Sequence, residues 1–261
     1  MNEPLKTSGT VQSLDRMFSI IEKMSLYPAG VMLTELSDLT DLHKSTVFRL
    51  LGSLIKNGYA IKDETAGKYR LTLKMYEIGL RTFGRTNITD VIHTYLRELA
   101  SETGECVHFA YRDGAEIVYM DKEDPSTNYF RISTKIGFRN LAFMTSLGKS
   151  MLCFLPRSEL LELWNKSNIV KRTEHTITDF PTAYQELQKI RAQGYAVDNE
   201  EWEAGLACVG VPIENFEGYP KYAISISVPS NRLNMSFIQS ILPALTASSK
   251  KISRFMGNTN N

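Results

Sequence analysis

The stretch between residues 34 and 56 constrains the fold of this chain more than any other part of its sequence. A short helix, capped by Thr34, is followed by a break at residues 40–42 and by a longer helix over about residues 43–56. Apolar residues share one face of the longer helix, and small, hydroxyl-bearing and basic residues share the other. Two helices separated by so short a turn form a helix-turn-helix. We expect its buried face to contain Val47, Leu50, Leu51, Leu54 and Ile55.

The flanking segments predict a winged helix-turn-helix over residues 11–72. A preceding helix begins at Ser13, a favourable N-cap residue, and carries apolar side chains at helical spacing. Two short strands, at residues 59–62 and 68–71, follow the helix-turn-helix and are joined by a turn. Residues 1–10 are expected to form a flexible arm. A helix over residues 74–83 is expected within a linker of residues 73–88.

From residue 89 to residue 257 the pattern indicates a second domain of the α+β class. Strands in runs, with helices before, between and after them, are typical of such a sensor domain. The expected strands cover residues 106–111, 117–122, 130–134, 207–213 and 222–228. The expected helices cover about residues 91–100, 145–154, 159–165, 182–193 and 234–256, the last of them bent at Pro243.

Charge and composition narrow the class of protein. Residues 1–85 hold 12 Lys and Arg against 9 Asp and Glu, which suits contact with DNA phosphates, whereas the remainder holds 18 against 20. No apolar run approaches the ~18 residues of a membrane span, and the polar N-terminus lacks a signal-peptide core, so we expect a cytoplasmic protein without membrane contact. Cys106, Cys153 and Cys208 have no zinc-binding spacing and are expected to be buried thiols, with no metal or cofactor.

The outward face of the longer helix fits the major groove of double-stranded DNA. Ser45 and Thr46 can reach phosphates or base edges, and Arg49 can read a guanine through two hydrogen bonds. Two basic side chains on the second strand lie where a wing would meet phosphates. A merely solvated polar face is the alternative, which the order of the flanking elements disfavours. The predicted DNA contacts are Thr34, Lys44, Ser45, Thr46, Phe48, Arg49, Lys68 and Arg70.

Several strings of this sequence resemble the IclR family of bacterial transcriptional regulators, in order and over nearly the whole chain. Residues 44–51, Lys-Ser-Thr-Val-Phe-Arg-Leu-Leu, are similar to the recognition helix of that family, and residues 194–198, Gly-Tyr-Ala-Val-Asp, match its second domain. The resemblance implies a sequence-specific regulator, here a repressor of a catabolic operon, that forms a homodimer or tetramer. It also implies a GAF-like α/β effector-binding domain, joined to the winged helix by a linker helix, for small organic acids or aromatic compounds.

The start of the helix after residue 144 is a candidate effector site. Its hydroxyls and free backbone N–H groups suit an anion, although a plain N-cap by Thr145 explains the same residues. Phe143 and Met144 stand where the family often has histidine and alanine, which favours a smaller or more apolar pocket. The resemblance implies a pocket lined by Ser146, Leu147, Asp198, Leu206, Cys208, Ser225 and Ser227.

The charge of Asp198 bears on the class of effector. An ionised Asp198 would repel a carboxylate, so we expect it to accept hydrogen bonds from ligand hydroxyls while backbone amides near Ser146 take the carboxylate. This division indicates a hydroxylated acid, such as a sugar acid. The acidic cluster that continues through Glu200, Glu201 and Glu203 reads alternatively as a solvated face. Cys208 reads alternatively as a core thiol.

The sequence also allows two other functions, an enzyme and a winged helix that contacts only proteins. Cys208, His175 and Asp179 could form a nucleophile set, but none of the four histidines lies in a catalytic motif, so we do not expect an enzyme. A winged helix that contacts only proteins would show no affinity for DNA and no steep dependence on salt.

Overall fold

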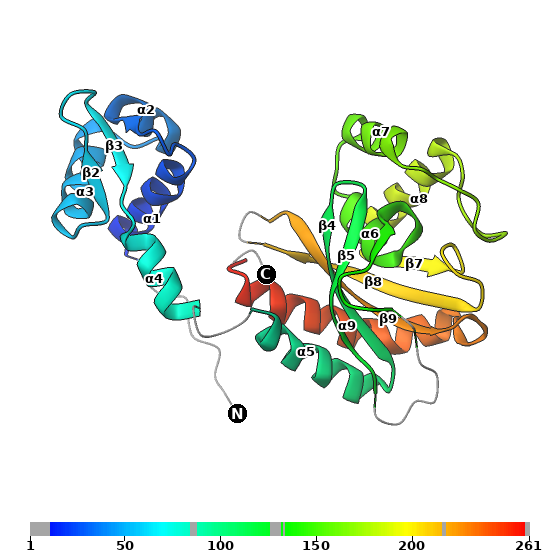
Figure 1. Ribbon diagram of the computed structural model, residues 1–261. Coiled ribbons are helices and arrows are strands. Elements are labelled where there is room, and N and C mark those ends of the chain that lie inside the picture. Colours follow the sequence, from blue (N-terminus) through cyan, green and yellow to red (C-terminus); the bar gives the residue numbers. More distant parts are fainter. Residues whose placement is uncertain (1–10, 84–87, 126–131, 133, 216–217, 259–261) are drawn as a thin grey trace. The chain divides into compact units, whose positions relative to one another are not determined.

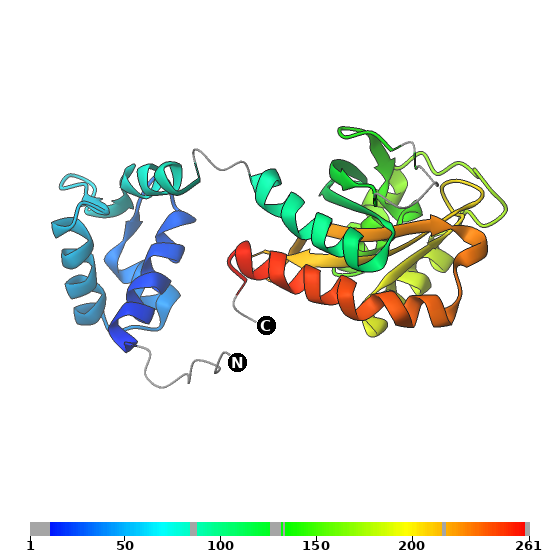
Figure 2. The ribbon, with the colours of Figure 1, turned by 90° about the horizontal axis from the view of Figure 1, so that it is seen from below.

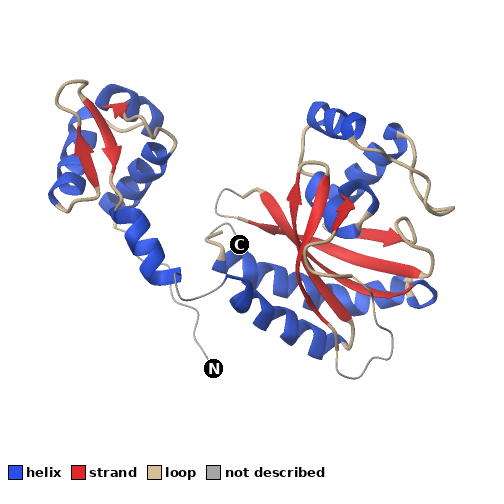
Figure 3. Cartoon of the chain, viewed as in Figure 1, coloured by secondary structure: helices blue, strands red, loops and turns tan. Residues whose placement is uncertain are grey.

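The computed structural model describes residues 11–83, 88–125, 132, 134–215 and 218–258. Its contacts divide the chain into two compact units, residues 1–87 and residues 88–261 (Figure 1). Each unit has a sheet and helices packed against it (Figure 3). Helix α4 (Lys74–Phe83) falls in the first unit, and residues 84–87 of the expected linker lie outside the described residues.

The first unit has the order of elements expected for a winged helix-turn-helix. Its helices are α1 (Gln12–Ser25), α2 (Leu33–Thr40), α3 (Lys44–Lys56) and α4. Its strands, β1 (Val31–Met32), β2 (Ala60–Lys62) and β3 (Lys68–Leu71), form an antiparallel sheet in the order β1-β3-β2. The sequence did not predict β1, a strand of two residues in which Val31 pairs with Tyr69 and Met32 with Lys68.

The apolar face of α3 forms the centre of this unit. Val47 and Leu51 are fully buried, and Leu50 and Leu54 nearly so, as their helical spacing predicted. Ile55 is 38% exposed, so its assignment to this face was wrong. It follows Leu54 by one residue, and a turn of about 100° carries its side chain away from the core. The core also contains Ile20, Met24, Val31, Leu36, Ala60 and Tyr69.

Two predicted helix caps were wrong. Helix α1 begins one residue earlier than expected, because the N–H of Leu14 donates to the carbonyl of Val11 at 2.7 Å and places Ser13 inside the first turn. Helix α2 has Met32 as its N-cap, so Thr34 is its second residue. The Glu35 carboxylate accepts a hydrogen bond from the N–H of Met32 at 2.8 Å. That carboxylate therefore supplies the capping contact that the sequence assigned to Thr34.

The second unit is a six-stranded antiparallel sheet in the order β6-β5-β4-β9-β8-β7. Its strands are β4 (Cys106–Asp113), β5 (Glu116–Glu123), β6 (Arg139–Leu141), β7 (Ala196–Asn199), β8 (Leu206–Glu214) and β9 (Pro220–Pro229). The short edge strands β6 and β7 were not predicted. Of the strand predicted at residues 130–134, residues 130, 131 and 133 lie outside the described residues, and Ile132 and Thr134 are not in a strand.

Helices cover both faces of this sheet. Helices α5 (Ile88–Thr103) and α9 (Met235–Phe255) lie side by side on one face, as Figure 2 shows. Helices α6 (Ser146–Leu152), α7 (Arg157–Lys166) and α8 (Phe180–Gln193) lie on the other face (Figure 1). Along β9, Ile224, Ile226 and Val228 join the core under α5 and α9. The alternating residues Ser225 and Ser227 therefore face the side of α6.

Helix α6 lies unusually close to its neighbours because two glycines lack side chains. A Cβ on Gly148 would lie 2.2 Å from the carbonyl oxygen of Ala142. A Cβ on Gly210, in β8, would lie 2.8 Å from the carbonyl carbon of Ser146. Gly148 thereby lets α6 pack against the backbone of Ala142, and Gly210 lets the start of α6 pack directly against the sheet.

We predict that Gly148→Ala lowers the free energy of unfolding of the second unit by about 3 kcal/mol or more, because the methyl group overlaps backbone that cannot move aside easily. Gly52→Ala, in α3, is the control, since an added Cβ there has no atom within 4 Å. It should leave the second unit unchanged and stabilise α3 by up to about 1 kcal/mol. Scanning calorimetry measures the unfolding transitions of both units. An equal stability of the second unit in the two variants would contradict the close packing of α6.

Candidate functional site

Helix α3 presents an exposed face that carries the predicted base contacts. Ser45 and Arg49 are exposed, Thr46 is half-buried, and Phe48 is 62% exposed although it is a large apolar side chain. His43 caps the helix: its Nδ1 accepts a hydrogen bond from the N–H of Ser45 at 3.4 Å and lies 2.8 Å from the Ser45 hydroxyl. The sequence missed this role of His43, which orients Ser45 at the start of the exposed face.

The remaining predicted DNA contacts lie on neighbouring elements. Thr34 and Lys44 are exposed at the first turns of α2 and α3. Lys68 and Arg70 lie on β3 on either side of the buried Tyr69, so they share one face of the strand. An α-helix with such a face fits the B-DNA major groove, which is ~12 Å wide.

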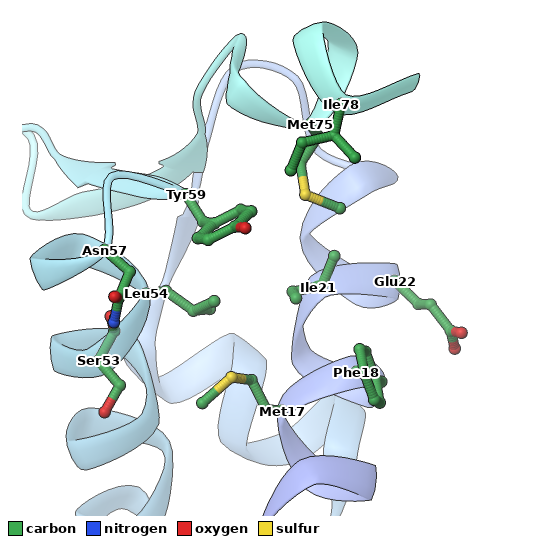
Figure 4. A pocket seen from close by; sticks show the side chains of 10 residues that line it. All are labelled: Met17, Phe18, Ile21, Glu22, Ser53, Leu54, Asn57, Tyr59, Met75 and Ile78. Atoms are coloured by element: carbon green, nitrogen blue, oxygen red, sulfur yellow. The ribbon is translucent and has the colours of Figure 1, made fainter. Parts of the chain in front are cut away.

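An apolar groove lies on another side of the first unit (Figure 4). Phe18 projects from α1 and is 59% exposed, and Met75 and Ile78 of α4 are more than one-third exposed. The amino group of Lys74 donates to the carbonyl of Asn57 at 2.6 Å and lies 4.6 Å from the centre of the Tyr59 ring. These contacts hold α4 against the end of α3. The groove is lined by Met17, Phe18, Ile21, Glu22, Ser53, Leu54, Asn57, Tyr59, Met75 and Ile78.

All seven residues predicted for the effector pocket line a single cavity in the second unit. Ser146 and Leu147 come from the first turn of α6, Asp198 from β7, and the others from β8 and β9. The hydroxyl of Thr145 accepts a hydrogen bond from the N–H of Gly148 at 3.0 Å, so the predicted cap is present at the cavity wall. Residues that the sequence analysis did not assign to the pocket also line it: His108, Tyr119, Ile132, Thr134, Asn140, Thr145, Trp202 and Glu203.

Strand pairing explains why the sequence did not predict that His108 and Tyr119 line the cavity. His108 lies directly opposite Ser225 in the β4–β9 ladder, and its ring meets that of Tyr119 edge to face, with centres 5.4 Å apart. The Tyr119 hydroxyl accepts a hydrogen bond from the side-chain amide of Asn140 at 3.2 Å. The alternation of β4 and β5 signals which of their residues share a face, but the pairing of β4 with the distant β9 has no local signal.

A chain of hydrogen bonds crosses one wall of the cavity. The Ser227 hydroxyl lies 3.2 Å from Nδ1 of His108 and 3.1 Å from Sγ of Cys208. Burial lowers the pKa of His108 to about 3, so its ring is neutral. Loss of solvation, followed by the nearby charge of Asp198, raises the pKa of the Cys208 thiol. Cys208 therefore stays a protonated hydrogen-bonding group and is a poor nucleophile.

Asp198 is buried, and the pKa of its carboxyl is well above the ordinary value. Burial, then the charge of Glu201, raises the pKa of Asp198 to about 7, while Lys149 opposes the shift. One carboxylate oxygen of Asp198 accepts a hydrogen bond from the N–H of Glu201 at 2.8 Å. The solvated-face interpretation is wrong for Asp198 and Glu201, which are 4% and 6% exposed, and it holds for Glu203. Near neutral pH, Asp198 is only partly ionised, so it can donate as well as accept.

A buried ion pair stands behind this wall. Nζ of Lys149, one turn after Ser146 on α6, pairs with Oε1 of Glu201, and both side chains are almost fully buried. Burial raises the pKa of Glu201, and the adjacent Lys149 counteracts that rise. Removing either partner would leave an uncompensated buried charge, which typically costs about 3–5 kcal/mol.

The residues of the alternative nucleophile set occupy separate positions. The Cys208 thiol is within hydrogen-bonding distance of the Ser227 hydroxyl. The Asp179 carboxylate caps α8 by accepting a hydrogen bond from the N–H of Thr182 at 2.9 Å. His175 is exposed in the segment before α8. Over the described residues, no three His, Cys, Asp or Glu side chains gather as a metal site. No helix in that part of the chain has the length and apolarity required to span a bilayer.

Two family profiles match the two units of this chain. The IclR helix-turn-helix domain matches residues 13–64, and the C-terminal domain of the bacterial transcriptional regulator IclR matches residues 80–254. The DNA-binding transcriptional repressor YiaJ of Escherichia coli is 34% identical over 95% of this chain and 89% of its own length.

Solved structures show the same likeness. The crystal structure of the Thermotoga maritima IclR matches 95% of this chain and all of that chain, with a TM-score of 0.62 and 32% identity. The inducer-binding domain of the transcription factor PobR from Acinetobacter, a double mutant in complex with 3-hydroxybenzoic acid, matches 63% of this chain and 96% of its own. Its TM-score is 0.59 and its identity 26%.

The charge of Asp198 predicts how the stability of the second unit depends on pH. Its folded pKa of about 7 lies above its ordinary value of 3.8, so between these values the folded protein holds a proton that the unfolded chain has lost. Stability should therefore fall as the pH rises through this window, by at most about 1.4 kcal/mol per pH unit for one proton.

In Asp198→Asn this contribution disappears, although the shifted Glu201 remains in both proteins. The slope of the free energy of unfolding between pH 4.5 and 7 should become shallower. Urea unfolding can be followed by the fluorescence of Trp164 and Trp202, which both lie in the second unit. Identical slopes would contradict the raised pKa of Asp198.

Proposed function

Because this chain belongs to the IclR family of bacterial transcriptional regulators, we propose that it is an effector-responsive repressor of a catabolic operon and that its effector is a small hydroxylated organic acid. The observation that carries the proposal is the combination, in one chain, of an exposed basic helix face on α3 with a polar cavity in a separate unit. The repressor named as a relative supports the sign of regulation. A repressor of this kind acts on DNA, so we place the action of this protein in the cytoplasm.

We assign the reading of the operator to α3. Arg49 is exposed near the middle of the helix, where its guanidinium can make two hydrogen bonds to a guanine. Ser45, held by His43, can bond a phosphate or a base edge, and Phe48 can contact a thymine methyl group. Lys68 and Arg70 can bond phosphates from the strand that forms the wing. The base contacts would select the sequence, and the phosphate contacts would add affinity for any DNA.

A two-fold symmetric operator requires two recognition helices, and therefore a homodimer. The groove between α1, α3 and α4 supports this assembly, because it exposes Phe18, Met75 and Ile78 together (Figure 4). Exposed apolar patches of this kind mark interaction surfaces. Apolar side chains of both α1 and α4 line this groove.

The lining of the cavity supports a hydroxylated acid as the effector. Ser225, Ser227 and the neutral His108 offer hydrogen-bond partners to hydroxyl groups, and the partly protonated Asp198 can donate or accept. Ser146 can bond the acid group. The PobR domain bound to 3-hydroxybenzoic acid supports the same class, since its ligand carries a hydroxyl and a carboxyl group. Binding would shift the population between DNA-binding and released forms.

The test of the function is in vitro selection of DNA by the full-length protein at near-physiological salt. We expect enrichment of one two-fold symmetric sequence. Addition of D-gluconate or 3-hydroxybenzoate, a sugar acid and an aromatic acid, should lower the recovery of that sequence if the compound belongs to the effector class. Failure to enrich any sequence would refute the reading of DNA by this protein. Binding of aromatic acids with no sugar acid from a broad panel would refute the expectation that the hydroxylated acid is a sugar acid.

Arg49→Ala should cost about 1–3 kcal/mol of affinity for the selected sequence and relax base preference at one position, because it removes a base contact. Lys68→Ala should weaken binding to selected and random DNA alike and reduce the slope of affinity against salt. Fluorescence anisotropy at several salt concentrations separates the two outcomes. Equal losses on both DNAs for Arg49→Ala would contradict its role in base reading.

Phe18→Glu should weaken dimerisation through the groove, because the new carboxylate would be buried against apolar residues of the second copy. Loss of paired binding should weaken affinity for the two-fold site by about 100-fold or more while leaving half-site affinity unchanged. Gln12→Glu, exposed on the same helix and outside the groove, is the matched control. Unchanged affinity of Phe18→Glu for the two-fold site would exclude the groove as the dimer contact.

A further inference from the structure

One wall of the effector cavity is a loop that a second segment holds from behind. Residues 200–205 connect β7 to β8, and Trp202 and Glu203 of this loop line the cavity. Residues 172–176, which precede α8, lie against this loop and contact it through side chains. None of the residues 172–176 lines the cavity itself. We call this segment the strap.

The strap binds three successive carbonyl groups of the loop. The Thr173 hydroxyl donates to the carbonyl of Glu200 at 2.5 Å, and the Thr176 hydroxyl donates to the carbonyl of Glu201 at 2.8 Å. Nε of Arg172 donates to the carbonyl of Trp202 at 2.9 Å. The Arg172 guanidinium also lies 3.8 Å from the centre of the Trp202 indole ring, which is a cation–π contact.

Thr176 organises this set of contacts. Its side chain is buried at 7% exposure, and its hydroxyl oxygen accepts hydrogen bonds from the backbone N–H groups of Arg172 and Thr173, at 3.1 and 3.0 Å. The same hydroxyl donates to Glu201. One side chain therefore folds the strap and joins it to the loop, so its removal releases both interactions together.

Glu201 transmits the position of the strap to the opposite side of the loop. Its carbonyl is held by Thr176, its N–H donates to Asp198 at 2.8 Å, and its carboxylate pairs with Lys149. The preceding residue, Glu200, has a left-handed backbone with φ of 62°, which non-glycine residues seldom adopt without support. Hydrogen bonds within the loop, such as that from the N–H of Gly205 to the Glu200 carboxylate at 2.7 Å, and the contacts of the strap together support this conformation.

We propose that the strap positions the cavity wall for its effector: Arg172 holds Trp202 directly, and Thr173 and Thr176 hold the two preceding residues, so that Glu201 keeps Asp198 in the arrangement that binds the ligand. They are positioning residues, since they act through the loop and not on the ligand. The proposal rests on the proposed function, in which this cavity binds the effector. It adds that the affinity for the effector depends on the strap residues, which lie outside the cavity.

The test uses full-length protein carrying Trp164→Phe, which leaves Trp202 as the only tryptophan. Thr176→Val removes the hydroxyl at nearly constant volume, and Thr176→Ser retains it. Thr178→Val is the matched control, because Thr178 is exposed and lies outside the strap. The readouts are acrylamide quenching of Trp202, hydrogen exchange of the amides of residues 200–206, and binding of D-gluconate and of 3-hydroxybenzoate.

In Thr176→Val we expect exchange in residues 200–206 to become about five- to tenfold faster, as for the loss of the one hydrogen bond that Thr176 donates to the loop. We also expect Trp202 to become more accessible to acrylamide. The affinity of whichever probe binds should fall by a similar factor. Thr176→Ser and Thr178→Val should behave as the parent. Rescue by serine would show that the hydroxyl, and not general packing, holds the wall.

Unchanged quenching and exchange in Thr176→Val would overturn the strap. Faster exchange with unchanged probe affinity would overturn its link to the binding site. A parent protein that binds neither probe would count against the effector class of the proposed function, and quenching and exchange would then decide on the strap alone.

Discussion

The buried ion pair between Lys149 and Glu201 is the interaction on which the second unit most depends. It joins α6, whose first turn carries Ser146, to the loop that carries Trp202. Both side chains are almost fully removed from water, so each requires the other. The pair also affects the charge of Asp198: burial is the main cause of the raised pKa of that carboxyl, Glu201 raises it further, and Lys149 lowers it. The cavity therefore forms only where helix and loop meet in this arrangement.

Two features place α6 where this pair can form. Gly148 and Gly210 allow the backbone of the helix to approach η1 (Ala142–Met144) and β8 more closely than any side chain would permit. The cavity that results is lined by hydroxyl, thiol, amide and imidazole groups, with His108 kept neutral by burial. Such a surface distinguishes ligands by the number and direction of their hydrogen bonds, since each unmatched buried group costs free energy.

Local pattern predicted some elements well and failed at others for identifiable reasons. The buried face of α3 followed from helical period, because Val47, Leu50, Leu51 and Leu54 recur at that spacing. The caps at Ser13 and Thr34 were wrong, since backbone and Glu35 contacts start both helices earlier. The sequence missed β1, β6 and β7, each a strand of four residues or fewer at the edge of its sheet.

The sequence by itself determined the two-part organisation, the exposed basic face of α3, and the seven residues that were expected in the effector pocket and that line one cavity. These depend on helical period, turn residues and family strings, all of which are local. Only the tertiary structure decided that His108 lies opposite Ser225, that Asp198 has a raised pKa, and that Thr176 bonds the Glu201 carbonyl behind the cavity wall. Each of these depends on pairing or burial between segments far apart in the chain, and no local pattern encodes such contacts.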